Sequence, residues 1–265
     1  MGKSQPKVLC IGGSDPAQGA GVQMDARVVR AFGMEPLTVV TVDTVQNEQG
    51  LQQVSPRRLR TFADDLLAAL EAEPCAVKLG ALGDELLTEA VAEMLEPWVG
   101  RFPMVLDPVT QASRAKDGVE LNTKRGQELM WQHLLPLVTV ATPNHTEFAL
   151  AEPAYRKAGA CLVKGGHAST ITVNDLLLQT GQDPIEIVHS RLAGATEIHG
   201  TGCALSSALA CLLAEGLDLE TAAHRAIQIM HGWLQDTLAQ EQRELVLKPP
   251  RWMRAEAESE NGRDA

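Results

Sequence analysis

The pentapeptide His199-Gly200-Thr201-Gly202-Cys203 joins two segments of different character. It follows the strand-like run 185–188 and a short loop, and it opens into the apolar run 204–214, which predicts a buried helix. Glycine on each side of threonine lets the backbone turn tightly, so that successive N–H groups point into one concavity. The positive end of the helix macrodipole lies at the same place, and the expected ligand is therefore an anion.

Cys203 occupies the last position of this loop, where it would feel the same electrostatic field. A helix N-terminus lowers the pKa of a cysteine, so we expect the pKa of this thiol to fall toward neutrality. An anion cradle with a thiol beside it favours phosphoryl transfer. The alternative is a glycine helix cap followed by a core cysteine, which an isolated Gly-x-Gly-x motif would favour. The remaining motifs of the chain bear on this choice.

Outward from this loop, short apolar runs alternate with segments whose apolar residues recur at every third and fourth position. The predicted strands are 8–11, 37–42, 76–79, 104–106, 138–141, 161–163, 176–178 and 185–188. The predicted helices are 22–31, 59–70, 84–95, 121–134, 204–214 and 219–238. This alternation predicts an α/β fold with a mostly parallel central sheet and helices on both faces, its later strands being candidates for antiparallel pairing.

The polar and glycine-rich loops follow the predicted strands. They span 12–21, 43–50, 80–83, 107–118 and 142–147. In open parallel sheets, ligands bind beyond the carboxyl ends of the strands. We therefore expect these loops to gather around one site.

The composition limits the classes of partner. The chain has 265 residues and a formal net charge of −11, which argues against nucleic acid and against an anionic membrane surface. The length suits one large domain, predicted over 1–250, and the polar, charged segment 251–265 is expected to be a disordered tail. Five cysteines without metal spacing, together with the lack of a signal-like or membrane-length apolar run, fit a cytoplasmic protein.

Two loops on the amino-terminal side carry candidate binding residues. The loop 12–21 matches neither the dinucleotide fingerprint nor the P-loop, but its glycines allow close approach of a ligand. Asp25 beyond it could face a polar heterocycle or a hydroxyl; alternatively it is a solvated acid in the first turn of a helix. Gln46 has both donors and an acceptor, which suits the edge of an aminopyrimidine.

Two later motifs carry candidates for metal and nucleotide binding. Glu147 stands one turn after Asn144 at a strand end, where it could hold water on Mg²⁺, an ion that prefers oxygen ligands. The alternative is an ordinary helix start with an acidic first turn. Lys164 and Gly166 end the next strand and could line a nucleotide site or form a simple glycine turn.

Taken together, these motifs resemble the hydroxymethylpyrimidine/phosphomethylpyrimidine kinases of thiamine biosynthesis, in the ribokinase-like superfamily. The motifs run in the family's order, from about residue 8 to about residue 238. They are Gly-Ser-Asp-Pro followed by Gly-Ala-Gly-Val-Gln-Met-Asp, Thr-Val-Gln-Asn, Val-Lys-Leu-Gly, Leu-Asp-Pro-Val, Thr-Pro-Asn-His-Thr-Glu, Val-Lys-Gly-Gly-His and His-Gly-Thr-Gly-Cys-Ala-Leu-Ser.

The resemblance implies a three-layer ribokinase-like fold and ATP-dependent phosphorylation of 4-amino-5-hydroxymethyl-2-methylpyrimidine and of its monophosphate, with Mg²⁺ as cofactor. It makes Cys203 the base and Gly200, Thr201 and Gly202 the anion hole. The pyrimidine would be bound by Asp25, Gln46, Thr44, Leu82 and Val109. The nucleotide would be bound by Lys164, Gly166 and Asn144, and the metal by Glu147 and Asp107. A homodimer is compatible with the resemblance.

Two other readings of the chain stay open. A pyridoxal or pyridoxine kinase has the same fold and a flat hydroxymethyl heterocycle as substrate, and the altered loop 109–114 could accommodate it. A non-catalytic pyrimidine-binding protein is the second alternative. It is favoured by Ile227, which stands where relatives often have lysine, and by the short connection 147–164, whereas the intact Gly-Thr-Gly-Cys motif argues against it.

Overall fold

The computed structural model describes residues 5–47, 50–110, 120–166 and 171–250. Its strands are β1 (Lys7–Ser14), β2 (Glu35–Asn47), β3 (Gly50–Pro56), β4 (Ala76–Leu79), β5 (Met104–Leu106), β6 (Val140–Ala141), β7 (Ala160–Val163), β8 (Thr172–Gln179) and β9 (Ile185–Ser190). Its α-helices are α1 (Gly21–Ala31), α2 (Leu59–Glu71), α3 (Glu85–Leu95), α4 (Lys124–Leu129), α5 (His145–Leu150), α6 (Glu152–Tyr155), α7 (Thr201–Ala214) and α8 (Leu219–Ala239). A π-helical turn (Met130–Leu134) extends α4, and 3₁₀ turns span Glu96–Trp98, Leu135–Leu137 and Ala195–Glu197.

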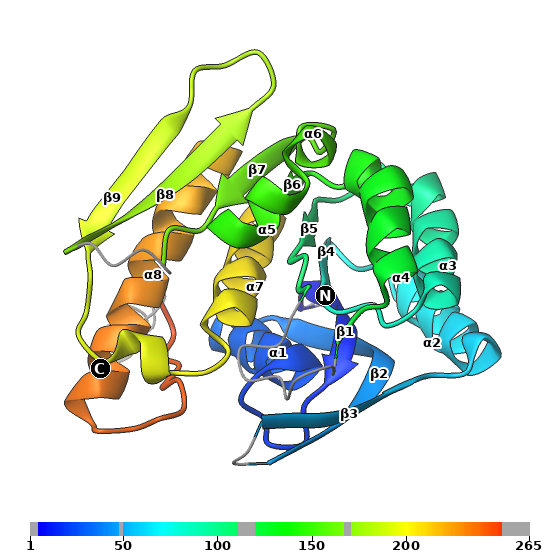
Figure 1. Ribbon diagram of the computed structural model, residues 1–265, viewed down its shortest axis with the longest axis horizontal. Coiled ribbons are helices and arrows are strands. Elements are labelled where there is room, and N and C mark those ends of the chain that lie inside the picture. The colour runs from blue at the N-terminus through cyan, green and yellow to red at the C-terminus, as the bar shows by residue number, and fades with distance from the viewer. Residues whose placement is uncertain (1–4, 48–49, 111–119, 167–170, 251–265) are drawn as a thin grey trace, which may run out of the picture.

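The strands of the described chain form one nine-stranded sheet in the order β3-β2-β1-β4-β5-β6-β7-β8-β9 (Figure 1). The six central strands, from β2 to β7, pair in parallel. The outer pairs β2–β3, β7–β8 and β8–β9 are antiparallel. The predicted mixed sheet, parallel in its centre and antiparallel at its later strands, is therefore confirmed.

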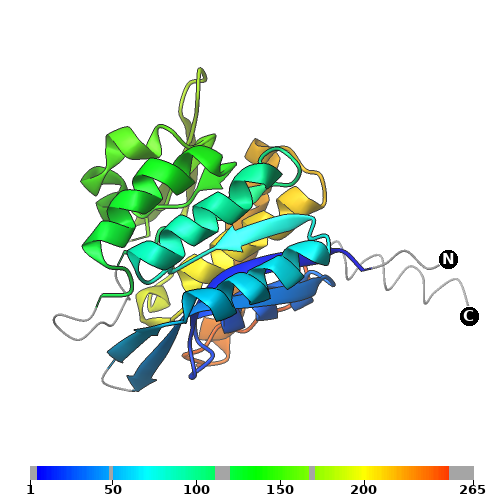
Figure 2. The same cartoon turned by 90° about the vertical axis from the view of Figure 1, so that its right-hand side faces the viewer.

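Alternation along the strands divides the core into two layers. In β1, Val8 and Cys10 pack with α1, α7 and α8, whereas Leu9 and Ile11 pack on the opposite face with α2, α3 and the α4 segment. Successive side chains of a strand point to opposite faces, so a strand buried on both faces is apolar throughout. Figure 2 shows α2, α3 and α4 in front of the strands, with α7 and α8 behind them.

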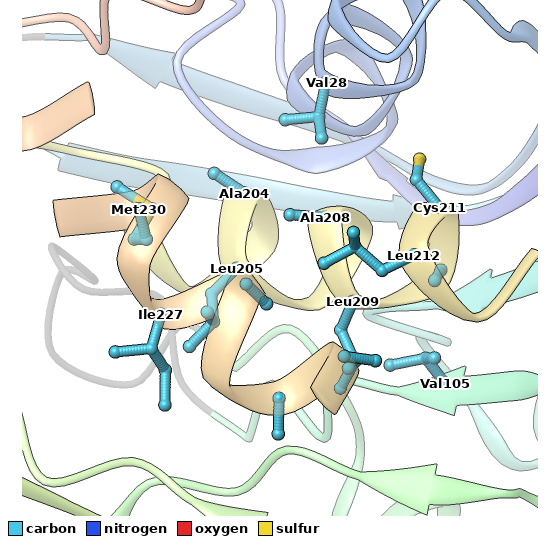
Figure 3. Packing of buried hydrophobic residues seen from close by; sticks show 14 of the residues in the cluster. Val28, Val105, Ala204, Leu205, Ala208, Leu209, Cys211, Leu212, Ile227 and Met230 are labelled. Atoms are coloured by element: carbon cyan, nitrogen blue, oxygen red, sulfur yellow. The ribbon is translucent and has the colours of Figure 1, made fainter. Parts of the chain in front are cut away.

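Helix α7 is the central element of one layer. All of its residues from Ala204 to Leu212 are buried, as predicted from the apolar run. Figure 3 shows Ala208 on the side of α7 toward Val28 of α1, and Leu209 on the side toward Val105 of β5. Small residues on one side and large residues on the other let α7 lie close to α1 and fill the space above the sheet.

The element boundaries differ from the prediction in two places. Segment 43–50 was expected to be a loop, but β2 continues to Asn47 and returns as β3, which forms an antiparallel hairpin. The helix expected over 121–134 begins later, after Thr123, whose hydroxyl accepts the N–H of Gly126. Asp84 caps α3, since its carboxylate accepts the N–H of Leu87.

Within the described residues, no helix is both long enough and apolar enough to cross a membrane. All five cysteines are free thiols.

The described chain remains packed on the core almost to its end, at 250. Leu245 is 1% exposed and its carbonyl accepts a hydrogen bond from Arg27 of α1, while the indole of Trp233 donates to the carbonyl of Lys248. The proposed tail 251–265 lies outside the described residues. We therefore keep the domain boundary at 250 as a prediction.

Truncation after Pro250 is expected to leave the melting temperature and the activity nearly unchanged, because the segment 251–265 is polar and has no apolar period. Thermal denaturation checks this, with a second truncation after Arg243 as the control. The shorter chain loses Leu245 and should melt several degrees lower, since burying a leucine side chain contributes roughly 1.5–3 kcal/mol. Equal melting temperatures for the two truncations would place the boundary earlier than 250.

Candidate functional site

The predicted anion loop lies at the amino end of α7, next to the carboxyl ends of the parallel strands. Gly200 has a φ of +74°, and a Cβ there would lie 2.0 Å from the carbonyl oxygen of Gly19. Only glycine fits so close an approach in this left-handed conformation. The N–H groups of Thr201, Gly202 and Cys203 belong to the first turn of α7, which has no intrahelical acceptors for them. The arrangement supplies donors for an anion.

The loop between β1 and α1 packs against this turn. Gly21 has a φ of +58°, and a Cβ there would lie 2.2 Å from the carbonyl oxygen of Gly13. The carboxylate of Asp15 accepts the N–H groups of Ala17 and Ala20 at 2.9 and 2.8 Å. Asp15 therefore shapes the loop from within.

The ion pair of Lys164 with Asp107, on one side of Gly202, forms the charged centre of the site. Lys164 at the end of β7 donates to Asp107 at the end of β5, with Nζ and Oδ1 2.7 Å apart. The hydroxyl of Ser206 in α7 donates to the other oxygen of Asp107 at 3.3 Å. A Cβ on Gly202 would lie 3.4 Å from the ammonium of Lys164, so this cation stands directly beside the anion loop.

The ionisation of this pair follows from its surroundings. Burial by itself raises the pKa of Asp107, but Lys164 and Lys78 outweigh burial and hold the pKa below its ordinary value. Burial lowers the pKa of Lys164, whereas Asp107 and Glu147 raise it, and the net direction is upward. Both groups therefore stay charged near neutral pH.

Asn144 and Glu147 begin α5 as a reciprocal capping box. The amide oxygen of Asn144 accepts the N–H of Glu147, and the carboxylate of Glu147 accepts the N–H of Asn144, each at 2.8 Å. The helix-start reading of this motif is therefore confirmed, and a second role in holding magnesium stays a prediction. Glu147 also accepts the N–H of Thr110 at 3.2 Å, and burial raises its pKa.

A second buried ion pair lies under the site, between α1 and β4. Lys78 is 1% and Asp25 0% exposed, and their Nζ and Oδ2 atoms are 2.9 Å apart. The other oxygen of Asp25 accepts the hydroxyl of Ser207 at 2.9 Å. Burial alone lowers the pKa of Lys78, but Asp25 and the other anionic neighbours raise it above its usual value.

This geometry changes the expectations for Asp25. The reading as a solvated first-turn acid is wrong, because the residue is fully buried. Each carboxylate oxygen accepts a hydrogen bond from the protein, and the side chain joins α1, β4 and α7 beneath the anion loop. Direct contact of Asp25 with a pyrimidine stays a prediction.

Cys203 lies half-buried in the first turn of α7, as the sequence placed it. The expected fall of its pKa is wrong: burial raises the pKa of this thiol to about 11. Lys78 lowers the pKa, but Asp25 and Asp107 oppose that effect. The unliganded protein therefore carries Cys203 as a neutral thiol at neutral pH.

The residues expected to line the acceptor site come from β2 and from the loops after β4 and β5. Thr44 in β2 is buried, and its hydroxyl donates to the carbonyl of Ser14 at 2.7 Å. Leu82 is buried after β4, and Val109 is half-buried after β5. Gln46 lies in β2, where it pairs with Leu51 of β3. These residues therefore lie in β2 or follow β4 and β5, and their binding of an acceptor stays a prediction.

The nucleotide-side candidates follow β7. The N–H of Gly165 donates to Asp175 of β8 at 2.7 Å, and a Cβ on Gly165 would lie 2.1 Å from the carbonyl oxygen of Asn174. The carbonyl of Gly166 accepts a hydrogen bond from Arg191. A Cβ on Gly166 would meet no atom of the described residues within 4 Å.

Four residues of the site network were not predicted: Lys78, Asn122, Ser206 and Ser207. The two serines were read as part of an apolar helix. Lys78 interrupts the apolar run of β4 at a position that faces α1 and α7, and a charged residue in a strand buried on both faces is itself a signal of a buried partner. Asn122 had no signal in the sequence.

Ile227, which favoured the non-catalytic alternative, is a core residue. It lies in α8, is 4% exposed and packs in the core with α7 (Figure 3). A lysine at this position would place a charge in an apolar core. The connection 147–164 contains the short helices α5 and α6 and leads into β7. Lys164, at the end of β7, forms a parallel β-bridge with Asn144.

Comparisons with known proteins agree with the resemblance. The family model for phosphomethylpyrimidine kinase matches residues 15–247. The hydroxymethylpyrimidine/phosphomethylpyrimidine kinase of Streptomyces coelicolor is 34% identical over 86% of this chain and 88% of its own. That of Rhizobium meliloti is 32% identical over 84% of this chain and 88% of its own.

Solved structures confirm the fold. The phosphomethylpyrimidine kinase of Clostridium difficile superposes with a TM-score of 0.70 at 26% identity, covering 86% of this chain and 99% of that one. The pyridoxal kinase of Staphylococcus aureus in complex with AMP-PCP and pyridoxal gives a TM-score of 0.77 at 25% identity, covering 88% and 89%. The predicted three-layer α/β architecture is the one these kinases share.

Proposed function

Because the chain belongs to the phosphomethylpyrimidine kinase family, we propose that it transfers the γ-phosphoryl group of ATP to 4-amino-5-hydroxymethyl-2-methylpyrimidine and to its monophosphate. The observation that carries this proposal is the first turn of α7, whose N–H groups lie beside the ammonium of Lys164. Phosphoryl transfer is mostly a matter of positioning and of stabilising charge on the transferring group. N–H donors and a fixed cation in one place supply that stabilisation.

We assign the following roles to the catalytic residues. Gly200, Thr201 and Gly202 form the anion hole, and Lys164, held by Asp107, neutralises charge on the phosphates. Cys203 is the candidate to take the proton of the acceptor hydroxyl. With a pKa raised to about 11 its thiolate is scarce but strongly basic, and in a loose transition state the proton leaves late. Asp25 supports this turn from below through Ser207.

Magnesium would enter this site mainly with the nucleotide. The described residues contain no group of three or more His, Cys, Asp or Glu side chains that could hold a metal ion. Mg²⁺ typically keeps several waters and binds through one or two carboxylates plus substrate phosphates. The oxygen donors of Glu147 and Asp107 fit that requirement, and the ion would neutralise charge on the phosphates.

The acceptor is expected at the edge formed by Thr44, Gln46, Leu82 and Val109. The direct test is ATP consumption by the purified protein with the hydroxymethylpyrimidine, its phosphate, pyridoxal or no acceptor, each with and without Mg²⁺. We expect turnover of the pyrimidines that requires Mg²⁺. Faster turnover of pyridoxal would assign the chain to the alternative activity of its structural neighbours, and binding without turnover would make it a non-catalytic protein.

Replacing Gln46 with alanine is expected to raise KM for the pyrimidine by roughly tenfold or more, because the lost hydrogen bonds leave polar groups of the bound ring unpaired. Steady-state kinetics with varied acceptor measure this. Gln53→Ala is the matched control, since Gln53 is an exposed glutamine of β3 in the same hairpin. An equal KM in the two variants would remove Gln46 from the acceptor site.

We also propose a cytoplasmic location, which the five free thiols support. A homodimer is the assembly we expect from the family resemblance. Size-exclusion chromatography with light scattering tests it.

A further inference from the structure

Asn122 lies outside the residues assigned above to either substrate, yet it hydrogen-bonds to two of the loops that end at the acceptor edge. Its Oδ1 atom accepts the N–H of Leu82 at 2.7 Å and that of Gly83 at 2.8 Å. Its Nδ2 atom donates to the carbonyl oxygen of Val109 at 2.5 Å. The residue is 3% exposed, so these bonds are made away from water.

The chemistry of this contact requires an amide. One side chain must accept two N–H groups on one atom and donate to a carbonyl from the other. An aspartate has the same shape but no donor, and a leucine has neither function. Any such replacement leaves buried main-chain polar groups without partners, which is the costly case for a hydrogen bond.

Besides their bonds to Asn122, the loops after β4 and β5 are held by different partners. The carbonyl of Ala81 accepts the hydroxyl of Thr41 in β2 at 2.6 Å, and the carbonyl of Gly83 accepts the N–H of Thr123 at 2.7 Å. The loop after β5 is held on its far side, where Glu147 accepts the N–H of Thr110. Asn122 is the side chain that bonds to both loops and so sets their separation.

We propose that Asn122 is a positioning residue that fixes the spacing between Leu82 and Val109, and that this spacing favours an aminopyrimidine over the more heavily substituted ring of pyridoxal. The proposal rests on the proposed function in one respect: the acceptor ring must lie between these two loops. Asn122 then acts on the substrate only through its two neighbours. Its loss should change the choice of acceptor and leave the nucleotide side intact.

The test is the kinetics of Asn122→Asp, which keeps the shape of the side chain, removes the donor to Val109 and adds a negative charge. We expect KM for the pyrimidine to rise about tenfold, with kcat and KM for ATP each within about threefold. The ratio of kcat/KM for the pyrimidine over that for pyridoxal should fall about tenfold. Asn122→Ala, which adds no charge, should change the ratio in the same direction.

Thr237→Val is the matched control. Thr237 is a fully buried polar residue of α8 that donates to the carbonyl of Trp233 at 2.7 Å and accepts the N–H of Val246 at 2.9 Å. Its loss should lower stability without changing the acceptor ratio. If KM for the acceptor and KM for ATP rise together in Asn122→Asp, or if the ratio is unchanged, Asn122 has only a general structural role and the proposal is overturned.

Hydrogen–deuterium exchange on the unmodified protein keeps the test independent of how well the variants fold. The pyrimidine should slow exchange of the Leu82 and Gly83 amides, whereas an ATP analogue alone should not. Unchanged exchange with bound pyrimidine would overturn the proposal. If no heterocycle binds or turns over, the proposed function fails instead, and faster exchange of these two amides in Asn122→Ala, which removes their acceptor, still measures the hydrogen bonds of Asn122 separately.

Discussion

Cys203→Ala is expected to lower kcat by roughly 10²–10⁴-fold, the usual range for the loss of a general base, with little change in KM for the acceptor. The reason is positional: the thiol stands in the first turn of α7, next to the donors that would hold the transferring phosphoryl group. Single-turnover and steady-state kinetics of the purified variant measure it. Cys211→Ala, the same change two turns along the same helix, is the control and should keep its kcat.

The pH dependence follows from the raised pKa of this thiol. Burial raises the pKa of Cys203 to about 11, so the thiolate fraction of the free enzyme increases about tenfold for each pH unit below that value. We expect kcat/KM to rise with pH between about 7 and 9, and the slope to be lost in Cys203→Ala. A kcat within threefold of the unmodified enzyme for Cys203→Ala would reduce the residue to a packing role.

Lys78→Met is expected to destabilise the protein by about 3–5 kcal/mol, because it leaves the carboxylate of Asp25 buried without its counter-ion. The pair is 1% and 0% exposed, so water cannot replace the lysine. Adding Asp25→Asn should recover much of the loss, since the uncompensated charge is then gone. Urea denaturation of the single and the double variant measures the free energies of unfolding.

The matched control is Arg57→Met, which breaks the exposed pair of Arg57 with Asp43, whose side chains are 42% and 50% exposed. Exposed pairs contribute about 0–1 kcal/mol.

The deficit of Lys78→Met should depend on pH. Burial raises the pKa of Asp25, and Lys78 is the main cation that opposes this rise, so the pKa of Asp25 should be higher still in the variant. A carboxyl whose folded pKa exceeds its unfolded value stabilises the fold at low pH, so the deficit of Lys78→Met should shrink as pH falls. A pH-independent loss below 1 kcal/mol would contradict the assignment.

Much of the fold could be predicted from the sequence because its strands are buried on both faces. The predicted runs 76–79 and 104–106 match β4 and β5 residue for residue. Apart from Lys78 these two strands are apolar, and they end at glycine or at Asp-Pro, so their limits are visible locally. The β2–β3 hairpin was missed because its polar residues, Asp43 to Asn47, look like a loop when the partner strand is unknown.

The position of the site could be predicted, because it follows from the topology of the sheet. The contacts between residues that are far apart in the sequence could not. Loops that follow parallel strands meet at one edge, which is why the loop that begins at Asp107 was expected at the site. The ion pair of Asp107 with Lys164 at the end of β7 was not predicted. The ion pair of Asp25 with Lys78 joins residues 53 positions apart, and no local pattern identifies such a partner. The prediction of a lowered pKa for Cys203 was wrong for the same reason. The sequence shows that the thiol lies at a helix N-terminus, but it does not show the burial of the thiol or the carboxylates around it.

The two adjacent serines of α7 have a consequence for how the protein is made. Ser207 bonds to a carboxylate 182 positions earlier in the chain, and Ser206 to one 99 positions earlier. A ribosome has therefore synthesised every strand of the sheet before the residues that complete these contacts emerge. Until then the partly made chain carries Asp25 and Asp107 without their hydroxyl partners and without the glycine loop. With the role proposed for that loop, the chain becomes able to bind a phosphate group only when the last third of the polypeptide has been made.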